Sequence, residues 1–474
     1  MLAVAAAVAL DLGTTTIKAG LLSADGELHG IVARPVPEMN VDGGRYESDA
    51  LAYAHAADEV LAECLARIAG LAQTDARPPL GLCCQRSSFL VWERATGRPV
   101  TPLISWQDDR GAASCEALRG EEAEIRALAG LPITSYYLAP KLRVLLREHP
   151  AWREHLVRGE WLLGTLDTFL IWRWTDGRHY QTDASMAART LLMDVHERQW
   201  SPRLCELFGV PREALPEMCD SAGWALPLNN GLTLMASVAD QSAALVASIA
   251  IGSSDALVNL GTGGFVIRHL PYGCAAPAGY LQTLLWQDGD GLAHFACEGT
   301  LNSIASALAP YPAADCRAEE LARDDIFCLA EPSGLGAPYF RKDLGLMFSA
   351  PVEGLPPQRI AALLLEGIVF RVARMLEDMH SEFGIERVYL SGGLSNLSCL
   401  QQGIARCAPF ADVYLSPQSE VGLVGAARLA AGMPLVVERG VEKIAIICAP
   451  SKLAEKYACW KVWLDGLLSR RAAL

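Results

Sequence analysis

The chain has no excess of basic residues. Its 474 residues include 40 Lys and Arg against 54 Asp and Glu, and the formal net charge at pH 7 is −14. Proteins that bind nucleic acid usually carry a basic stripe or patch, so this composition argues against a nucleic-acid partner. It says little about small anionic ligands, because a turn of backbone amides can bind phosphate on an acidic protein.

Long apolar runs, repeats and low-complexity segments are also missing. No stretch reaches the ~18 uninterrupted apolar residues of a membrane span, so we expect no membrane partner. Residues 1–10 are apolar, but no basic segment precedes them and they run directly into Asp11, which favours a buried β-strand over a signal peptide. A hydrophobic fraction of 51% suffices to build compact cores, and at ~100–200 residues per domain the length predicts two or three domains.

Paired-cysteine motifs are absent as well. The chain has 14 cysteines, but none stand in a CxxC pair, and the neighbours Cys83 and Cys84 cannot easily bridge to each other. This pattern favours reduced, buried thiols in a cytoplasmic protein over a disulfide or zinc framework.

The hydrophobic pattern predicts two similar halves. Apolar runs bounded by turn residues predict strands, and a longer apolar periodicity predicts helices. In the first half we expect strands at 3–10, 17–22, 28–33, 80–84 and 89–92 and a helix at 48–71. In the second half we expect strands at 256–260, 265–267 and 387–390 and a helix at 357–380. Each half opens with a strand and a Gly/Thr turn, which indicates a duplicated α/β architecture with a cleft between its halves and a boundary near residue 250.

Three motifs could carry chemistry. In the segment Asp11-Leu12-Gly13-Thr14-Thr15-Thr16, Gly13 permits a sharp turn whose amides and hydroxyls can converge on an anion, and Asp11 at a strand end can hold Mg²⁺ through its waters. A hairpin with Thr-rich edges is the alternative, and the segment is neither a Walker loop nor a dinucleotide fingerprint. The run Gly261-Thr262-Gly263-Gly264 is a second such turn. Asp240 precedes an apolar helix at 242–248, where it could act as a base or simply cap the helix.

In order and spacing, these motifs resemble those of the FGGY carbohydrate kinases, and within them the members that phosphorylate glycerol. The resemblance covers about residues 7 to 460. The segments that carry it are Asp11–Thr16, Gln85-Arg86, Trp106-Gln107 with Arg110, Tyr136 with Lys141, Gly164–Thr168, Thr182-Asp183, Arg189-Thr190, Asp240-Gln241, Gly261–Gly263, Ser333–Tyr339, Glu366-Gly367 and Ser391–Gly393.

The resemblance implies an α/β fold of two actin-like (ribonuclease-H-like) domains with a catalytic cleft between them. The N-terminal domain, residues 1–249, would hold the acceptor and the catalytic base, and the C-terminal domain, residues 250–474, would bind the nucleotide. The implied cofactors are ATP and Mg²⁺, the partners are a small polyol or sugar and ATP, and a homodimer is one assembly that we consider.

The resemblance also implies roles for individual residues. Asp240 aligns with the family's catalytic base and Asp11 with the residue near Mg²⁺. The residues that fall on the acceptor site are Arg86, Ser87, Trp106, Tyr136, Asp240, Gln241 and Phe265. The residues that fall on the ATP site are Thr14, Thr15, Lys18, Gly261, Thr262, Gly392, Gly393 and Asn396.

Some positions depart from the family pattern. Kinases that phosphorylate glycerol carry an Arg-Glu pair in the acceptor site, whereas Ser87 follows Arg86 here. Beyond the adenosine loop at Gly392-Gly393, Arg406 stands near the place of a usual Asp. Past Glu298-Gly299, Ala305 stands near the place of a usual Gly. Three hypotheses follow: a kinase for glycerol or a close relative, a kinase for a longer polyol or a ketose such as xylulose or ribulose, and a catalytically silent sugar-binding regulator. Ser87 favours the kinase for a longer polyol or a ketose, because Ser is shorter than Glu and is a weaker hydrogen-bond acceptor.

Overall fold

The computed structural model describes residues 5–69, 78–250, 252–416, 420–433 and 441–470. They form two compact units. Unit 1 takes the described residues within 1–247, 283–295 and 420–435, and unit 2 takes those within 248–282, 296–419 and 436–474. The main break follows Ala247, two residues before the predicted end of the first domain. Two later segments nevertheless belong to unit 1, so the units are not the two continuous ranges expected from the sequence.

Unit 1 is built on a six-stranded sheet with the order β14-β15-β6-β1-β2-β3. The strands β1, β2 and β3 form an antiparallel meander, while β6 runs parallel to β1 and β15 runs parallel to β6. The bounds are β1 Ala5–Leu12, β2 Thr16–Ser23, β3 Leu28–Pro35, β6 Leu80–Cys84, β14 Ala222–Pro227 and β15 Thr233–Ala239.

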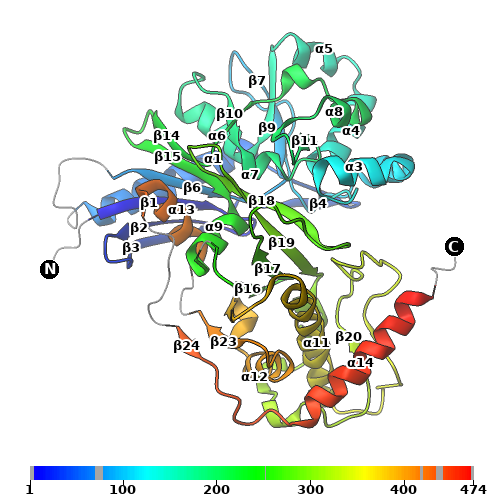
Figure 1. Ribbon diagram of the computed structural model, residues 1–474. Helices are drawn as coiled ribbons and strands as arrows, with labels where there is room; N and C mark the ends of the chain where they lie inside the picture. The colour runs from blue at the N-terminus through cyan, green and yellow to red at the C-terminus, as the bar shows by residue number, and fades with distance from the viewer. Residues whose placement is uncertain (1–4, 70–77, 251, 417–419, 434–440, 471–474) are drawn as a thin grey trace. The chain divides into compact units, whose positions relative to one another are not determined.

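Helices pack against both faces of this sheet. Side chains alternate between the faces of a strand, and on β1 the side chains of Val8, Leu10 and Leu12 join the core beneath α1 (Ala50–Ile68). The helix α1 begins after Asp49, whose carboxylate accepts hydrogen bonds from the next helical N–H groups. The helix α13 (Val421–Ala431) contacts β1, β6 and β15, and Figure 1 shows it against these strands although it lies late in the chain.

Glycines allow α13 to approach closely. A Cβ atom on Gly81 of β6 would lie 2.1 Å from the carbonyl oxygen of Ala426 on α13. On the helix itself, a Cβ atom on Gly425 would lie 1.8 Å from the carbonyl oxygen of Ala243. Both positions need glycine because the two backbones are in contact there.

The remainder of unit 1 forms a second layer of short elements. A five-stranded sheet has the order β4-β5-β8-β7-β9. Its strands are β4 Asn40–Asp42, β5 Arg45–Ser48, β7 Phe89–Glu93, β8 Leu103–Ile104 and β9 Trp161–Thr165. The helices of this unit are α2 Ala112–Ala117, α3 Glu122–Ala129, α4 Leu138–Glu148, α5 Trp152–Val157, α6 Leu166–Trp174, α7 Ala184–Ala187, α8 Pro202–Phe208 and α9 Asp240–Ser248, whose last residue belongs to unit 2. Two short ribbons pair β10 Gln181–Asp183 with β13 Glu217–Cys219 and β11 Met193–Asp194 with β12 Gln199–Trp200.

Unit 2 repeats the strand order of the first sheet. Its sheet has the order β18-β19-β17-β16-β22-β23-β24, in which β16 is antiparallel to β17 and parallel to β22. The strands are β16 Asp255–Leu260, β17 Gly264–His269, β18 Leu281–Gln287, β19 Ala293–Leu301, β22 Arg387–Ser391, β23 Asp412–Leu415 and β24 Glu442–Lys443. Most of β18 and the first residues of β19 fall in the segment 283–295, which is assigned to unit 1. A meander of three antiparallel strands followed by two parallel strands thus occurs in both units, as the duplication predicted.

A long helix forms the core of unit 2. The helix α11 (Pro357–Phe383) is buried along most of its length and contacts α12 (Ser398–Cys407), α14 (Lys452–Ser469) and α10 (Ile304–Leu308). A short ribbon, β20 Cys328–Leu329 with β21 Met347–Phe348, also packs on α11. Figure 1 shows α11 and α12 beside the strands of this unit.

Most predicted elements occur within a few residues of their expected bounds. The strand predicted at 80–84 is β6 without change, and the helix predicted at 357–380 is α11, three residues longer. The start of the strand predicted at 3–10 and the end of the helix predicted at 48–71 lie outside the described residues. All fourteen cysteines carry free thiols, and most of them are buried. Among the described helices, none has the length and apolar character to cross a membrane.

Candidate active site

Three parallel strands of unit 1 end at the same edge of the sheet and place the predicted acidic residues there. The strand pairing sets Asp11 beside Cys83 and Ala239 beside Cys84. Because β1, β6 and β15 run in parallel, the residues that follow them emerge together. Asp11, the run Gln85–Ser88 and Asp240 therefore lie at one edge, of which the sequence predicted only the strand-end position of Asp11.

Asp240 is the first residue of α9 and remains accessible. Its side chain is 32% exposed, and its Oδ1 atom accepts a hydrogen bond of 2.7 Å from the N–H of Gln241. The preceding N–H, on Ala239, donates to Ser185 Oγ at 2.8 Å. The same Oδ1 atom lies 3.7 Å from Nε of Arg86, which is 3% exposed. The carboxylate thus has a cationic neighbour and is partly exposed to solvent.

The pKa of the Asp11 carboxyl group is strongly raised. Burial, and then the carboxylate of Asp240, raise the pKa of Asp11 from 3.8 to about 7, while a hydrogen bond with the Cys83 thiol and the charge of Lys18 oppose the rise. Two carboxylates held close together repel each other, and a cation beside them relieves that repulsion. Mg²⁺ binds through one or two carboxylates together with waters and phosphate oxygens, so Asp11 and Asp240 fit such a site. Within the described residues, no group of three or more His, Cys, Asp or Glu is arranged to enclose a metal.

The Gly13 turn is held by a small hydrogen-bond network. Tyr53 Oη and Gln85 Nε2 both donate to the carbonyl oxygen of Gly13, at 2.7 Å and 3.2 Å. Thr14 Oγ1 donates to Gln85 Oε1 at 3.2 Å and accepts from Trp106 Nε1 at 2.9 Å. Thr15 is exposed, and its carbonyl oxygen accepts a hydrogen bond of 3.1 Å from the N–H of Val36. Thr14 therefore orders the loop through its side chain, whereas the side chain of Thr15 is presented to solvent.

The side chains of Trp106 and Tyr136 form an aromatic pair. Their ring centroids are 5.2 Å apart with the planes inclined at 46°, and both residues are half-buried. The guanidinium of Arg189 lies 5.9 Å from the Tyr136 ring centroid. Gln241 Oε1 is buried and finds no hydrogen-bond partner among the described residues, so it is available to a ligand hydroxyl. The sequence analysis singled out Arg189 only as part of the family pattern. Its position over the Tyr136 ring depends on the tertiary structure.

The structure favours a role for Ser87 other than the acceptor contact that the resemblance implied. Ser87 is fully buried, has a φ of +65°, and its Oγ donates to the carbonyl oxygen of Arg189 at 2.7 Å. The hydroxyl is therefore used in holding the end of β6 to the segment that carries Arg189. This geometry favours a packing role at the strand end, and we do not propose Ser87 as an acceptor contact.

Lys18 is already paired within unit 1. Its Nζ lies 2.7 Å from Glu420 Oε2, and the two side chains are 28% and 20% exposed. A phosphate that used Lys18 would have to share it with Glu420. Sequence reasoning missed Glu420, because it lies 402 residues away in the chain and just before α13.

The predicted nucleotide residues of unit 2 gather at the ends of its parallel strands. Asn259 pairs with Ser391, so the turn Gly261–Gly263 and the turn at Gly392-Gly393 leave the sheet side by side. Gly392 has a φ of +86°, and a Cβ atom there would lie 2.4 Å from the carbonyl oxygen of Leu260. Thr262, Gly393 and Asn396 are exposed, and Asn396 Nδ2 donates to the carbonyl oxygen of Gly393 at 3.4 Å. Phe265 is half-buried on β17, opposite Asn259.

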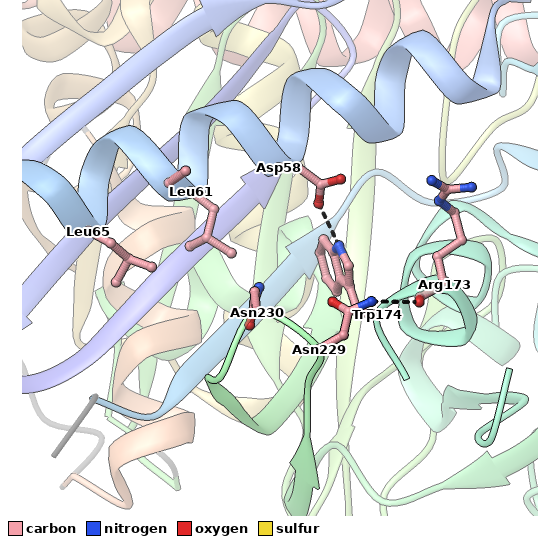
Figure 2. A pocket seen from close by; sticks show the side chains of 8 residues that line it. Asp58, Leu61, Leu65, Arg173, Trp174, Asn229 and Asn230 are labelled. Atoms are coloured by element: carbon pink, nitrogen blue, oxygen red, sulfur yellow. Dashed lines mark hydrogen bonds between the residues drawn. The ribbon is translucent and has the colours of Figure 1, made fainter. Parts of the chain in front are cut away.

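A pocket of about 510 Å³ lies at the other end of the unit 1 strands. Figure 2 shows the residues that line it, which are Asp58, Leu61, Ala62, Leu65, Arg173, Trp174, Asn229 and Asn230. Asn229 and Asn230 come before β15, whereas Asp240 follows it. The pocket therefore contains none of the predicted site residues.

Comparison with known proteins decides the family. Models of the FGGY family of carbohydrate kinases match residues 6–242 with the N-terminal domain and residues 256–433 with the C-terminal domain. The chain belongs to this family. It is thus a carbohydrate kinase, a phosphotransferase with an alcohol group as acceptor.

Individual FGGY relatives cover most of the chain. A glycerol kinase from Xanthobacter autotrophicus is 32% identical over 447 residues, which is 89% of both chains. An apulose kinase from Pectobacterium atrosepticum is 29% identical over 96% of both chains. The solved structure of Plasmodium falciparum glycerol kinase with ADP matches with a TM-score of 0.85 at 21% identity, over 98% of both chains. The predicted family and the α/β fold of two actin-like domains are confirmed.

Proposed function

We propose that this FGGY kinase transfers the γ-phosphoryl group of ATP to a hydroxyl of glycerol or a close relative, with Asp240 as the base. The observation that carries the proposal is the edge of the unit 1 sheet, where the partly exposed Asp240 lies beside Arg86 and near Asp11. Glycerol kinases at 32% identity over most of the chain support the choice of acceptor.

The residues of unit 1 suit an acceptor with several hydroxyls. The Arg86 guanidinium can donate to hydroxyl oxygens, and the unpartnered Gln241 Oε1 can accept from a hydroxyl. The Trp106–Tyr136 pair supplies an apolar wall for the carbon chain. Asp240 would take the proton from the attacking hydroxyl, a contribution of ~10²–10⁴-fold in rate for a well-placed base.

Phosphoryl transfer depends on positioning and charge neutralisation more than on covalent chemistry. Mg²⁺, when bound, would supply charge neutralisation on the transferring phosphate, and Asp11 is the carboxylate that we propose to hold it. Thr14, Thr15 and Lys18 in unit 1, and Gly261, Thr262, Gly392, Gly393 and Asn396 in unit 2, are the proposed ATP contacts, and Phe265 is a proposed acceptor contact.

A kinase for a ketose is the second candidate. The apulose kinase that matches 96% of the chain favours it. Ser87, which favoured a larger acceptor on sequence grounds, no longer supports it because its hydroxyl is bonded to the Arg189 carbonyl. The other proposed acceptor contacts do not discriminate between a glycerol kinase and a ketose kinase, since single contacts determine specificity weakly.

The test is a coupled ADP-release screen with ATP and Mg²⁺ across glycerol, erythritol, xylulose, ribulose, apulose and gluconate. We expect the highest kcat/KM with glycerol. A preference for apulose or xylulose would select the second candidate, and no ADP release with any acceptor would favour the silent regulator.

Asp240→Asn tests the base. We expect kcat to fall by at least ~10²-fold, because the amide cannot take the proton. Asp58→Asn is the matched control, since Asp58 is a partly exposed carboxylate of the same unit that bonds Trp174 Nε1 at 2.7 Å, away from the site. A folded Asp240→Asn variant with a kcat close to that of the control would overturn the role.

A further inference from the structure

Lys141 on α4 is buried, and among the described residues no carboxylate forms an ion pair with it. Its side chain is 0% exposed, and its Nζ donates hydrogen bonds to three backbone carbonyl oxygens: Ser105 at 2.8 Å, Trp106 at 3.1 Å and Tyr136 at 3.0 Å. An ammonium group has three N–H donors and no acceptor. All three donors of Lys141 are therefore used on main-chain groups.

Burying a cation in this way is costly. A neutral side chain of similar length, such as Met, would fill the same space without the desolvation of a charge. The three hydrogen bonds offset that cost only because the carbonyls converge on one point. Lys141 therefore holds backbone segments together, and its role depends on which segments these are.

The clamped segments carry the aromatic pair of the proposed acceptor site. The carbonyls of Ser105 and Trp106 belong to the loop after β8, and the carbonyl of Tyr136 belongs to the segment before α4. These two segments are far apart in sequence, and their side chains meet at the Trp106–Tyr136 contact, with ring centroids 5.2 Å apart. Trp106 is held from its other end by the hydrogen bond from its Nε1 to Thr14 Oγ1.

We propose that Lys141 is a positioning residue that sets the separation of Trp106 and Tyr136 and thereby the shape of the acceptor pocket. This inference rests on the proposed function, in which the two aromatic side chains contact the acceptor. Lys141 acts through their backbone and does not touch the acceptor itself.

The first arm of the test needs no substrate. Hydrogen exchange in the unliganded Lys141→Met protein should be faster than in the wild type in peptides covering residues 103–110 and 132–138. Lys456→Met is the matched control, because Lys456 is also buried, donates to the Asp324 carbonyl at 2.6 Å and pairs with Glu366 in unit 2. It should leave exchange in those two segments unchanged.

The second arm separates positioning from general destabilisation. For Lys141→Met we expect the KM of the preferred acceptor to rise by about tenfold or more, while kcat and the KM of ATP change by less than about threefold, since a misplaced pocket wall mainly weakens binding. Lys456→Met should leave the acceptor KM unchanged. In a Tyr136→Ala background, adding Lys141→Met should raise the acceptor KM much less than it does in the wild type.

Lys141→Gln is a second variant for the case that Lys141→Met does not fold. It retains two N–H donors, and we expect exchange rates and an acceptor KM between those of the wild type and Lys141→Met. Unchanged exchange in both segments, or equal changes in the KM of acceptor and of ATP, would overturn the inference. If the wild type phosphorylates none of the acceptors, the proposed function fails, and the exchange experiment alone then decides whether Lys141 holds the two segments.

Discussion

Removing the Glu331 carboxylate should strongly destabilise unit 2. Glu331 is 1% exposed, and its Oε1 lies 2.6 Å from Nε of Arg371, which is 0% exposed on α11. Glu331 Oε2 accepts from the N–H groups of Asn302 at 2.9 Å and Gly336 at 3.1 Å. The pair thus ties the central helix to two loops, one of which belongs to the Ser333–Tyr339 segment of the family pattern.

The magnitude follows from what Glu331→Ala leaves behind. The guanidinium of Arg371 would stay buried without a counter-charge. Removing one partner of a buried ion pair lowers the free energy of unfolding by ~3–5 kcal/mol. Two N–H groups would also lose their acceptor, at ~1–3 kcal/mol each, but these losses overlap because the groups share one carboxylate. We therefore expect a loss of ~3–5 kcal/mol. The double variant Glu331→Ala/Arg371→Met should be more stable than Glu331→Ala, because it removes the unpaired charge.

Hydrogen exchange of the α11 amides is the suitable assay, because a protein of two units need not unfold in one step. The control is Glu124→Ala, which breaks the ion pair with Arg203, whose members are 41% and 43% exposed. Exposed pairs contribute ~0–1 kcal/mol, so this variant should exchange like the wild type. A loss below ~1 kcal/mol in Glu331→Ala, or a double variant less stable than the single one, would refute the reasoning.

Three further predictions concern the site in unit 1. Asp11→Ala should lower kcat at every Mg²⁺ concentration and leave the acceptor KM nearly unchanged, and a Mg²⁺ titration identical to that of the wild type would count against a metal role for Asp11. Ser87→Glu should reduce stability by ~2 kcal/mol or more, because it buries a carboxylate, and should not alter the ratio of kcat/KM for glycerol and xylulose; a stable variant with a changed ratio would restore Ser87 to the pocket. Burial lowers the pKa of Lys141 from 10.5 to about 7, with Asp108 and Cys115 opposing the shift and Arg110 adding to it. The folded protein therefore loses this proton as pH rises through about 7 while the unfolded chain keeps it up to about 10.5, so this group makes unfolding less favourable at higher pH. The neutral amine keeps only two of its three donors, and the acceptor KM should rise between pH 6 and pH 8.5 in the wild type but not in Lys141→Met, measured with an uncharged acceptor at ~0.15 M ionic strength.

The strands β1, β2, β3 and β6 of the first sheet and β16, β17 and β22 of the second were predictable because local patterns specify them, whereas the outer strands of both sheets were not predicted. The strand at residues 80–84 is apolar throughout and bounded by turn residues, and the helix at 357–380 shows its periodicity within its own length. Two of the glycine turns require glycine for different reasons. A Cβ atom on Gly13 would lie 2.6 Å from the carbonyl oxygen of Thr16, and Gly392 has a φ of +86°. The family pattern then linked Asp11 and Asp240 to phosphoryl transfer, and the parallel pairing of β1, β6 and β15 places both at one edge of the sheet.

Contacts between distant segments were not predictable in the same way. The pairing of Lys18 with Glu420 spans 402 residues, and it exists because α13 packs on the sheet of unit 1 although it follows most of unit 2 in the chain. The Arg86-Ser87 dipeptide does not reveal that the Ser87 hydroxyl turns toward the Arg189 carbonyl.

The sequence by itself determined the opening strands and the long helix of each half, the two glycine turns of the nucleotide residues and the position of Asp11 at a strand end, because each depends on local conformational preference and the period of apolar residues. The tertiary structure alone decided which side chains are free to meet a substrate. It uses Ser87 in packing, pairs Lys18 with Glu420 and gathers three carbonyls around Lys141. The physical reason is that a hydrogen-bonding group takes whichever partners the folded chain brings within about 3 Å, and those partners come from segments that no local pattern connects.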